Sequence, residues 1–501
     1  MTVLFVTAFL VTGFSVTAFS VTAKSDIGIS MTSRSKVSFQ AKVSFRPSLA
    51  FVMLVLFMGV LWLAGGASRG EVPGQIVVRT ASWLVLIVMA VFGRRVDRSF
   101  ARPAWIFLAV AIAIAVLQLL PLPPALWHML PGREIIAKAG GADAVRLWQS
   151  WSLVPSETLN ALASLVVPFV VLLLAAALTQ KERAWLPGML LLFVIASMLL
   201  GIFQFSGAFA DNPLINDTPG AVGGTFANRN HFALFLALGC LLVPVWTFRE
   251  GRQLRWRGPA GLGMMGLFTL TILACGSRAG MALGALAILI AGLIARHGLR
   301  REFRRAPRWV PPVVVGGIIA LFASLVLISI VADRAVSVQR SFALDVGQDI
   351  RSRALPTVLD MTRSVFPAGS GLGSFDAMFR IHEPVDLLKP TYFNHAHNDF
   401  IEIVLDAGLP GLLTLLAALI WWGWASTRAW RSTGKHGTGK SGAMLPMLGS
   451  ATLLLVLIAS IFDYPARTPM IMAMVVLAAA WLSGHSDGDM EPALPKADHH
   501  L

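Results

Sequence analysis

Residues 185–205 read WLPGMLLLFVIASMLLGIFQF, a run of 21 residues without a charged side chain. A helix of about 20 apolar residues is long enough to cross the hydrocarbon core of a bilayer. Inside a bilayer no water is present to bond the backbone, and a helix satisfies its own hydrogen bonds. This stretch therefore predicts a membrane-spanning helix.

Runs of this kind recur along the chain and predict an all-α fold, a polytopic membrane protein with about 12 transmembrane helices and one long outer loop. The composition agrees, because 56% of the residues are hydrophobic and 13% are charged, whereas soluble domains carry about 25% charged residues. The predicted spans lie near Leu49–Ala64, Ile76–Phe92, Ala104–Leu120, Leu159–Leu178, Trp185–Phe205, His231–Thr247, Pro259–Cys275, Gly280–Ala295, Val310–Ala332, Pro410–Trp424, Met444–Phe462 and Met470–Ser483.

The net charge of +15 does not indicate nucleic-acid binding, because the basic residues lie in short segments between apolar runs. Alternate linkers are strongly basic, and by the positive-inside rule these linkers and both termini are cytoplasmic. The basic linkers hold Arg94, Arg95, Arg98 and Arg102, then Lys181 and Arg183, then Arg249, Arg252, Arg255 and Arg257, then Arg296, Arg300, Arg301, Arg304, Arg305 and Arg308, and finally Arg428, Arg431, Lys435 and Lys440.

The chain divides into five predicted regions. They are a low-complexity and then basic cytoplasmic N-terminus at 1–47, transmembrane helices 1 to 9 at 48–332, the long outer loop at 333–397, an interfacial helix with transmembrane helices 10 to 12 at 398–483, and a disordered cytoplasmic tail at 484–501. Ordered loops as long as 333–397 are usually functional.

Gly434–Ser441 fits the P-loop expression Gly-x-x-x-x-Gly-Lys-Ser. A P-loop needs a preceding strand and a following helix to hold the phosphate-binding amides. This segment lies in a short linker between two apolar runs, so we interpret it as a basic linker.

Polar clusters gather on the predicted outer face, while the span centres are almost free of charge. Each cluster alone can be explained by topology, since an Arg such as Arg278 can extend its side chain to the membrane surface. The clusters are Asn228–His231, Gly276–Arg278, Ile350–Leu355, Asn394–Asp399 and Asp463–Arg467.

Asp399, Glu402 and Asp406 are spaced three and four residues apart, which places them on one face of a helix. Either this face is solvated, with His395 and His397 as ordinary loop residues, or it belongs to a functional site. The following Gly408-Leu409-Pro410-Gly411 predicts a bend where the chain enters the membrane.

These motifs resemble those of the O-antigen ligase and O-antigen polymerase superfamily, bacterial envelope glycan transferases. The resemblance covers about Leu49–Ser483. Its most specific parts are His397-Asn398 with the later Gly408 and Leu-Pro-Gly turn, Ser277–Gly280 at a span start, Gly224–Ala233, and Arg351 with Leu355 ahead of Gly369–Phe375.

The resemblance implies transfer of a glycan from undecaprenyl diphosphate to an acceptor sugar hydroxyl at the periplasmic face of the inner membrane. The partners would be the lipid-linked donor, membrane lipids and an acceptor, either a lipid-A core or a second lipid-linked repeat. Leu413 stands where ligases often have a small or hydroxyl residue, which slightly favours a polymerase of O-antigen or exopolysaccharide.

The resemblance also implies residue roles. His397 is expected to be the general base or the group that orients the acceptor, because an imidazole titrates near neutral pH. Arg278 and Arg351 are expected to bind the diphosphate through their planar guanidinium groups, with Arg353 as a substitute. The remaining expected substrate-binding residues are Asn228, Asn230 and Asp399. We expect a metal-independent glycosyltransferase without a cofactor.

A 12-span secondary transporter or lipid-linked glycan flippase is the alternative function. Transporters place binding groups near the bilayer midplane, often in related halves of the chain. The sequence has neither midplane charges nor a clear internal repeat, and transport does not need a 65-residue outer loop. A non-catalytic assembly partner is a further alternative.

Overall fold

The computed structural model describes residues 47–484 apart from 95, 98, 140–146, 208–211, 216–220, 249–255, 305, 341–345, 389–392 and 436–443. The low-complexity N-terminus, most of the P-loop-like segment and nearly all of the predicted tail therefore lie outside the described residues.

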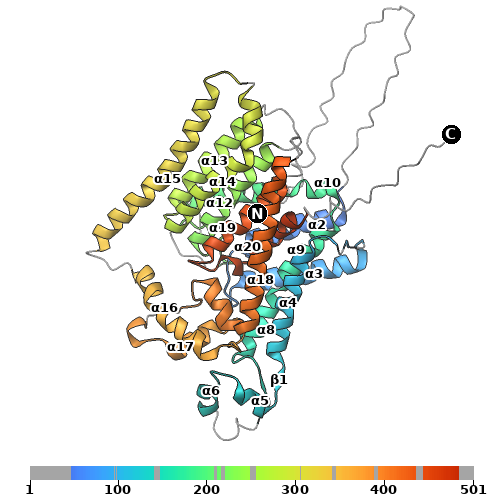
Figure 1. Cartoon of the computed structure of the whole chain (residues 1–501), viewed down its shortest axis with the longest axis vertical. Helices are drawn as coiled ribbons and strands as arrows, with labels where there is room; N and C mark the ends of the chain where they lie inside the picture. Colours follow the sequence, from blue (N-terminus) through green and yellow to red (C-terminus); the bar gives the residue numbers. More distant parts are fainter. Residues whose placement is uncertain are drawn as a thin grey trace, which may run out of the picture. The chain divides into compact units, whose positions relative to one another are not determined.

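The described chain is mostly helical, which confirms the all-α class (Figure 1). Two very short strands, β1 (Pro121–Leu122) and β2 (Gln149–Ser150), pair antiparallel. The helices are α2 (Leu49–Ala64), α3 (Pro73–Phe92), α4 (Arg102–Leu119), α5 (Pro124–Met129), α6 (Glu134–Ala139), α8 (Pro155–Ser164), α9 (Val166–Ala177), α10 (Gln180–Arg183), α11 (Leu186–Phe205), α12 (Arg229–Thr247), α13 (Arg257–Ala274), α14 (Arg278–Phe303), α15 (Val310–Arg340), α16 (Val346–Val365), α17 (Phe375–His382), η2 (Val385–Leu387), α18 (Asp399–Lys435), α19 (Met444–Ala459), η4 (Pro465–Arg467) and α20 (Pro469–Ser483).

Several of these helices can cross a membrane. Within the described residues, seven helical segments have the necessary length and apolarity, and they are Pro73–Phe92, Arg102–Leu119, Pro155–Ala177, Gln180–Phe205, Arg229–Thr247, Arg278–Phe303 and Asp399–Arg431. Four shorter apolar helices are Leu49–Ala64, Val310–Leu321, Met444–Ala459 and Pro469–Ser483. The outward faces of α3 and α4 expose large apolar side chains such as Trp83, Ile87 and Ile106. Such a surface needs an apolar surrounding.

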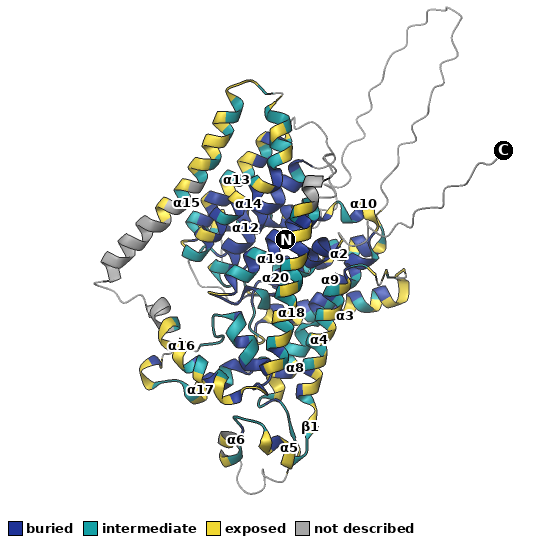
Figure 2. Ribbon diagram, viewed as in Figure 1, coloured by how far each residue is buried: buried dark blue, intermediate teal, exposed yellow. Residues whose placement is uncertain are grey.

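Helix α12 lies at the centre of the helical unit, where almost every residue is buried (Figure 2). It packs against α11, α13, α14 and α19. A helix that is apolar all round is stable when other helices surround it. The start of α12 is therefore held firmly. Two of the predicted site residues lie there, Asn228 as the N-cap of the helix and Asn230 in its first turn.

Helix α18 bends at Gly408, as the Gly-Leu-Pro-Gly segment predicts. Gly408 has φ 57° and ψ −140°, which is not helical. A Cβ atom there would lie 2.1 Å from the carbonyl oxygen of Pro367, so only glycine fits this position. The bend separates a short first part of α18, ending at Ala407, from the long apolar part.

The predicted outer loop is largely helical. Helix α15 continues through Asp333 to Arg340, beyond the predicted end of the span at Ala332, because charged residues do not by themselves end a helix. The loop then forms α16, α17 and η2. Their apolar side chains make a small core with the first part of α18, namely Ala354, Val358, Met361, Val365, Phe375, Met378, Phe379, Leu387 and Leu405.

A second outer segment joins this small core. The guanidinium group of Arg133 is buried and donates to the carbonyl oxygens of Pro131, Gly369 and Trp151, at 2.8, 3.0 and 2.6 Å. Trp127 is also buried, and its indole N–H donates to the carbonyl of Ser150 at 3.0 Å. The turn that ends α16 is thus tied to the segment after α4.

Candidate active site

Polar segments that are far apart in the sequence meet at the carboxylate of Asp463, between α19 and η4. The side-chain amides of Asn228 and Asn230 donate to Oδ2 of Asp463, at 3.0 and 2.8 Å. The Nδ1 atom of His397 lies 3.2 Å from Oδ1, and the backbone N–H of Tyr464 donates to Oδ1 at 3.0 Å. We define the Asp463 cluster as Asn228, Asn230, His231, His397, Asp463 and Tyr464.

Asp463 is buried, with 4% of its surface exposed. Burial alone would raise the pKa of the Asp463 carboxyl, but the neighbouring imidazoles of His231 and His397 interact with the carboxylate and hold this pKa well below its usual value. The carboxylate is therefore ionised at neutral pH, and it provides a fixed negative charge beside His397.

His397 has a constrained backbone and side chain. Its φ of 51° lies in the left-handed region, which is unusual for a residue other than glycine and often marks a functional position. Its ring lies 4.9 Å from the ring of Tyr464 and 5.0 Å from that of Phe393, measured between centroids. The imidazole is 12% exposed, so it remains partly accessible.

The pKa of His397 is lowered, chiefly because burial disfavours the charged imidazolium, and the charges of Arg351 and His395 act in the same direction. Asp463 opposes this shift. A neutral imidazole at pH 7 carries one proton, and the nearby carboxylate favours that proton on Nδ1. The lone pair is then on Nε2, where the imidazole can accept a proton.

Two helix starts hold the amides of the Asp463 cluster. Asn228 caps α12, since its side chain accepts from the backbone N–H of Asn230 at 2.8 Å. The side-chain oxygen Oδ1 of Asn230 accepts from Oγ of Ser277 at 2.7 Å, and Ser277 caps α14 by accepting from the N–H of Gly280 at 2.9 Å. Arg278 follows Ser277 as the first residue of α14 and is half-buried.

The two candidate arginines of α16 differ in their surroundings. Nη1 of Arg351 donates to the carbonyl oxygen of Phe462, the residue before Asp463, at 3.3 Å. Arg353 forms an ion pair with Asp386 and its side chain is 45% exposed. Residues two apart on a helix face different directions. The structure therefore brings Arg351 to the Asp463 cluster and places Arg353 beside Asp386.

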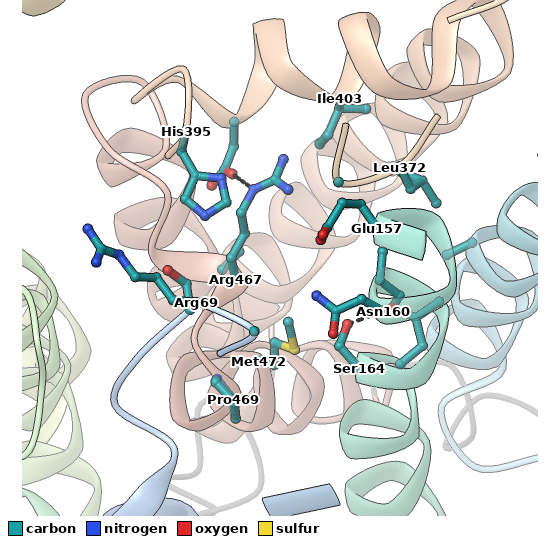
Figure 3. A pocket seen from close by; sticks show the side chains of 18 of the residues that line it. Arg69, Glu157, Asn160, Ser164, Leu372, His395, Ile403, Arg467, Pro469 and Met472 are labelled. Carbon is teal, nitrogen blue, oxygen red and sulfur yellow. Dashed lines mark hydrogen bonds and ion pairs between the residues drawn. The ribbon is translucent and has the colours of Figure 1, made fainter. Parts of the chain in front are cut away.

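Asp399 belongs to a second group of charged residues, around Arg467. The Arg467 guanidinium lies 3.0 Å from Oδ1 of Asp399, 3.2 Å from Oε1 of Glu402 and 3.9 Å from Oδ2 of Asp406. Nδ1 of His395 lies 2.8 Å from the same oxygen of Glu402. Figure 3 shows His395 beside Arg467. We call Asp399, Glu402, Asp406, His395 and Arg467 the Arg467 cluster.

The Arg467 cluster rules out the solvated acidic face as an interpretation of α18. Asp399, Glu402 and Asp406 are 6%, 0% and 0% exposed. Burial would lower the pKa of Arg467, but the charges of Glu402, Asp399 and Asp406 raise it above its usual value. The helical spacing predicted the common face, but the partner that covers it lies some 60 residues further along the chain.

Other residues of the two clusters were not predicted as site residues, although the polar segments that contain them were noticed. Asp463 and Arg467 belong to the polar turn 463–467, and His231 follows Asn230. His231 is 2% exposed, its Nε2 atom lies 3.7 Å from Oδ1 of Asp463, and neither ring nitrogen has a hydrogen-bond partner in the described structure. The sequence feature that could have identified Asp463 and Arg467 is the short polar turn 463–467, which begins with an aspartate, ends with an arginine and lies between two apolar runs.

Chemically, the Asp463 cluster combines an imidazole, a carboxylate that orients it, and the nearby guanidinium group of Arg351. A neutral imidazole held in this way can remove a proton from a hydroxyl group. Guanidinium groups can stabilise phosphate oxygens. Within the described ranges no group of three His, Cys, Asp or Glu side chains has the arrangement of a metal site.

No curated protein matches the chain significantly. Residues 260–416 match the family model of the O-antigen ligases. The matched range contains Arg278, Arg351, Arg353, His397 and Asp399. The match supports placing this chain in the O-antigen ligase and polymerase superfamily, as the motifs around His397 and Arg278 indicated.

Proposed function

We propose that the protein transfers a glycan from undecaprenyl diphosphate to the hydroxyl of an acceptor sugar at the periplasmic face of the inner membrane. The observation that carries the proposal is the His397–Asp463 pair, at 3.2 Å, with Arg351 bonded to the residue before Asp463. The O-antigen ligase match over residues 260–416 supports the same reaction class.

In the proposed reaction, Nε2 of His397 accepts the proton of the acceptor hydroxyl. The acceptor oxygen then forms a bond to the anomeric carbon of the donor glycan. The bond between that carbon and the diphosphate oxygen breaks, and the diphosphate leaves with the electron pair. The charge that develops on the leaving group needs cations, and we assign this role to Arg351 and Arg278.

Asp463 is a positioning residue in this scheme. Its carboxylate fixes the imidazole orientation and stabilises the imidazolium that forms during transfer. Asn228 and Asn230 hold the carboxylate from its other oxygen. We therefore assign these two asparagines to the support of His397, and Asp399 to the neighbouring Arg467 cluster, which braces the segment that carries His397.

The basic linkers support a topology with 12 spans, both termini in the cytoplasm and the two clusters facing the periplasm. Among the acceptors, the lipid-A core and a second lipid-linked repeat both present sugar hydroxyls to such a base. Leu413 favours the second of these, and so a polymerase.

The transfer assay with a labelled lipid-linked glycan, followed on a gel, tests the proposal. His397→Ala is expected to reduce product by at least about 10²-fold, the usual contribution of a general base. The matched control is His382→Ala, because His382 lies on α17 and bonds to the Met378 carbonyl at 2.9 Å, away from the Asp463 cluster. Normal product from His397→Ala, at normal protein level, would refute the proposal.

The same glycan-transfer assay tests whether Arg278 and Arg351 contribute to the reaction. Arg278→Lys and Arg351→Lys are each expected to lower transfer severely, because Lys keeps the charge but loses the planar two-pronged contact with phosphate. Arg363→Lys is the control, since Arg363 is exposed and pairs with Asp360 on the same helix. Equal activity of all three variants would remove the arginines from the mechanism.

A further inference from the structure

His231 is a buried imidazole of the Asp463 cluster to which the proposed reaction gives no part. It lies in the first turn of α12 and is 2% exposed, and neither ring nitrogen has a hydrogen-bond partner among the described residues. A buried polar group without a hydrogen bond is costly, and its presence in a folded protein needs an explanation. The Nε2 atom lies 3.7 Å from Oδ1 of Asp463, just beyond hydrogen-bond distance. His231 is therefore placed at the carboxylate that also contacts His397.

The Asp463 carboxylate already has a full set of donors. The two oxygens of a carboxylate accept about four hydrogen bonds. Oδ2 accepts from the two asparagine amides of the cluster. Oδ1 accepts from the backbone N–H of Tyr464 and lies 3.2 Å from Nδ1 of His397. His231 is thus a fifth polar group beside the same carboxylate, and it shares Oδ1 with His397.

The two imidazoles beside Oδ1 differ in their surroundings. His231 belongs to α12, which is buried along almost its whole length. Its ring packs edge-on against the ring of Tyr464, with the centroids 5.3 Å apart. His397 lies in the segment before α18, and its side chain is 12% exposed. His231 is therefore the enclosed neighbour of Oδ1, and His397 is the accessible one.

The Asp463 carboxylate determines which nitrogen of His231 carries the proton. A neutral imidazole has one N–H group and one nitrogen lone pair. The nitrogen near Oδ1 is Nε2, and a lone pair at that position would be repelled by the ionised carboxylate. The proton of His231 therefore lies on Nε2, where its partial positive charge is close to Oδ1.

We propose that His231 is a positioning residue that directs its Nε2–H at Asp463, shares the negative charge of this carboxylate with His397, and thereby keeps His397 from being held in its protonated form. A donor beside Oδ1 reduces the negative potential that Oδ1 presents to the His397 ring. The neutral and the protonated form of His231 both act in this direction, because each places a positive hydrogen beside Oδ1. The consequence for glycan transfer rests on the proposed function, whereas the effect on His397 does not.

Other titratable groups act on His397, and they are the same in all His231 variants. The charges of Arg351 and His395 lower the pKa of His397. Burial raises the pKa of the Tyr464 hydroxyl, so this group stays neutral. The starts of α12 and α14 carry further arginines, whose charge does not change with pH. They are Arg229 and Arg278.

Two substitutions of similar shape separate the N–H of His231 from the rest of its side chain. Gln carries an N–H about where Nε2 lies, whereas Met has a similar length and no donor. Hydrogen exchange at C2 of each imidazole in the full-length protein, read by mass spectrometry of its fragments, measures the pKa of His397 without the transfer reaction. His231→Met should raise this pKa by about 0.5 or more. His231→Gln should leave it near the wild-type value.

Three further variants make the measurement specific. His231→Phe keeps a ring against Tyr464 but has no N–H, so it should raise the pKa of His397 as His231→Met does. Phe235→Leu is the packing control, because Phe235 is buried one turn further along α12 and contacts the ring of Phe226. It should leave the pKa unchanged. Combined with Asp463→Asn, His231→Met should have no effect, since it acts through the carboxylate.

An unchanged or lowered pKa of His397 in either donor-free variant, His231→Met or His231→Phe, would overturn the proposal. Equal increases in His231→Met and His231→Gln would also overturn it, and so would an increase that persists with Asp463→Asn.

The pH profile of glycan transfer then measures the consequence for the reaction. A general base is active in its neutral form, so activity is lost as the pH falls through the pKa of His397. In His231→Met this pKa is higher, and the acidic limb should move to higher pH. An acidic limb that stayed in place although the pKa had risen would separate His231 from the reaction. A wild-type protein that transfers no glycan would refute the proposed function, while C2 exchange would still decide how His231 acts on His397.

Discussion

The chemistry of His397 depends on two opposing influences at the scale of single residues. Burial lowers the pKa of the imidazole, and the Asp463 carboxylate raises it. In the proposed reaction, the first influence keeps the ring neutral, as a base must be, and the second stabilises the ring once it has taken a proton. The His397 ring contacts the rings of Tyr464 and Phe393. These contacts hold the imidazole in one orientation, in which burial and the Asp463 charge both act on its pKa.

Asp463→Asn should change both the rate and the pH dependence of glycan transfer. A base works in its neutral form, so activity is lost as the pH falls through the pKa of His397. Without the Asp463 charge this pKa falls further, and the acidic limb of the profile should move to lower pH. The maximum rate should drop about 10²-fold or more, because the ring loses its orienting partner.

The pH profile of purified enzyme measures both effects. Asp386→Asn is the control, because Asp386 is exposed and pairs with Arg353 on the outer segment. It should leave the acidic limb in place. An acidic limb that moved to higher pH in Asp463→Asn, or an undiminished rate, would show that Asp463 does not act through His397.

At the scale of elements, the bend in α18 determines where the His397 segment lies. Gly369 and Gly408 approach each other closely, and a Cβ atom on Gly369 would lie 2.6 Å from the backbone nitrogen of Gly408. The N–H of Leu409 donates to the carbonyl of Pro367 at 2.8 Å. The turn after α16 is thereby packed into the bend. The buried ion pairs of Arg467 then fasten the first part of α18 to η4.

Gly408→Ala is expected to destabilise the protein by at least about 1–3 kcal/mol, the usual cost of a strained backbone position, and by more where the new Cβ meets Pro367. Gly423→Ala lies in the same helix and has no atom within 4 Å of its added Cβ. It should be neutral or stabilising by up to about 1 kcal/mol. Thermal unfolding in detergent compares the two variants, and equal melting temperatures would contradict the role of the bend.

For the whole molecule, the sequence predicted the helices better than the contacts between them. Each predicted apolar run overlaps a helix, because an apolar run is a property of the local sequence, but Leu159–Leu178 is divided between α8 and α9, and Met444–Phe462 continues past the end of α19. The observed helix ends differ from the predicted ones where a helix continues into charged residues. Helix α15, for example, ends at Arg340 instead of the predicted Ala332. Within the described residues seven segments have the length and apolarity of spans, so the number twelve stays a prediction.

The candidate site was predictable only in part. Four of the predicted site residues belong to recognisable motifs, namely His397, Arg351, Asn228 and Asn230. The structure brings them together around Asp463. The part played by Asp463 was not predictable, since it arises from contacts with residues 66 to 235 positions away. Likewise, the spacing of Asp399, Glu402 and Asp406 in the sequence predicts that the three carboxylates share one face of a helix. It does not predict whether that face contacts water or Arg467.

Reporter fusions test the topology on which the proposed function depends. Fusions after Gly251, His297 and Gly437 should report cytoplasmic locations, and fusions after Asp217, Ala368 and Asp386 periplasmic ones. The reason is electrostatic, because Lys and Arg in short loops are retained on the cytoplasmic side, and the linkers near the first three positions are the basic ones. An alkaline phosphatase and a green fluorescent protein fusion at each position give opposite signals and control for expression. A robust periplasmic signal after His297 would reverse the alternation and put His397 on the cytoplasmic side, where a periplasmic lipid-linked glycan could not reach it.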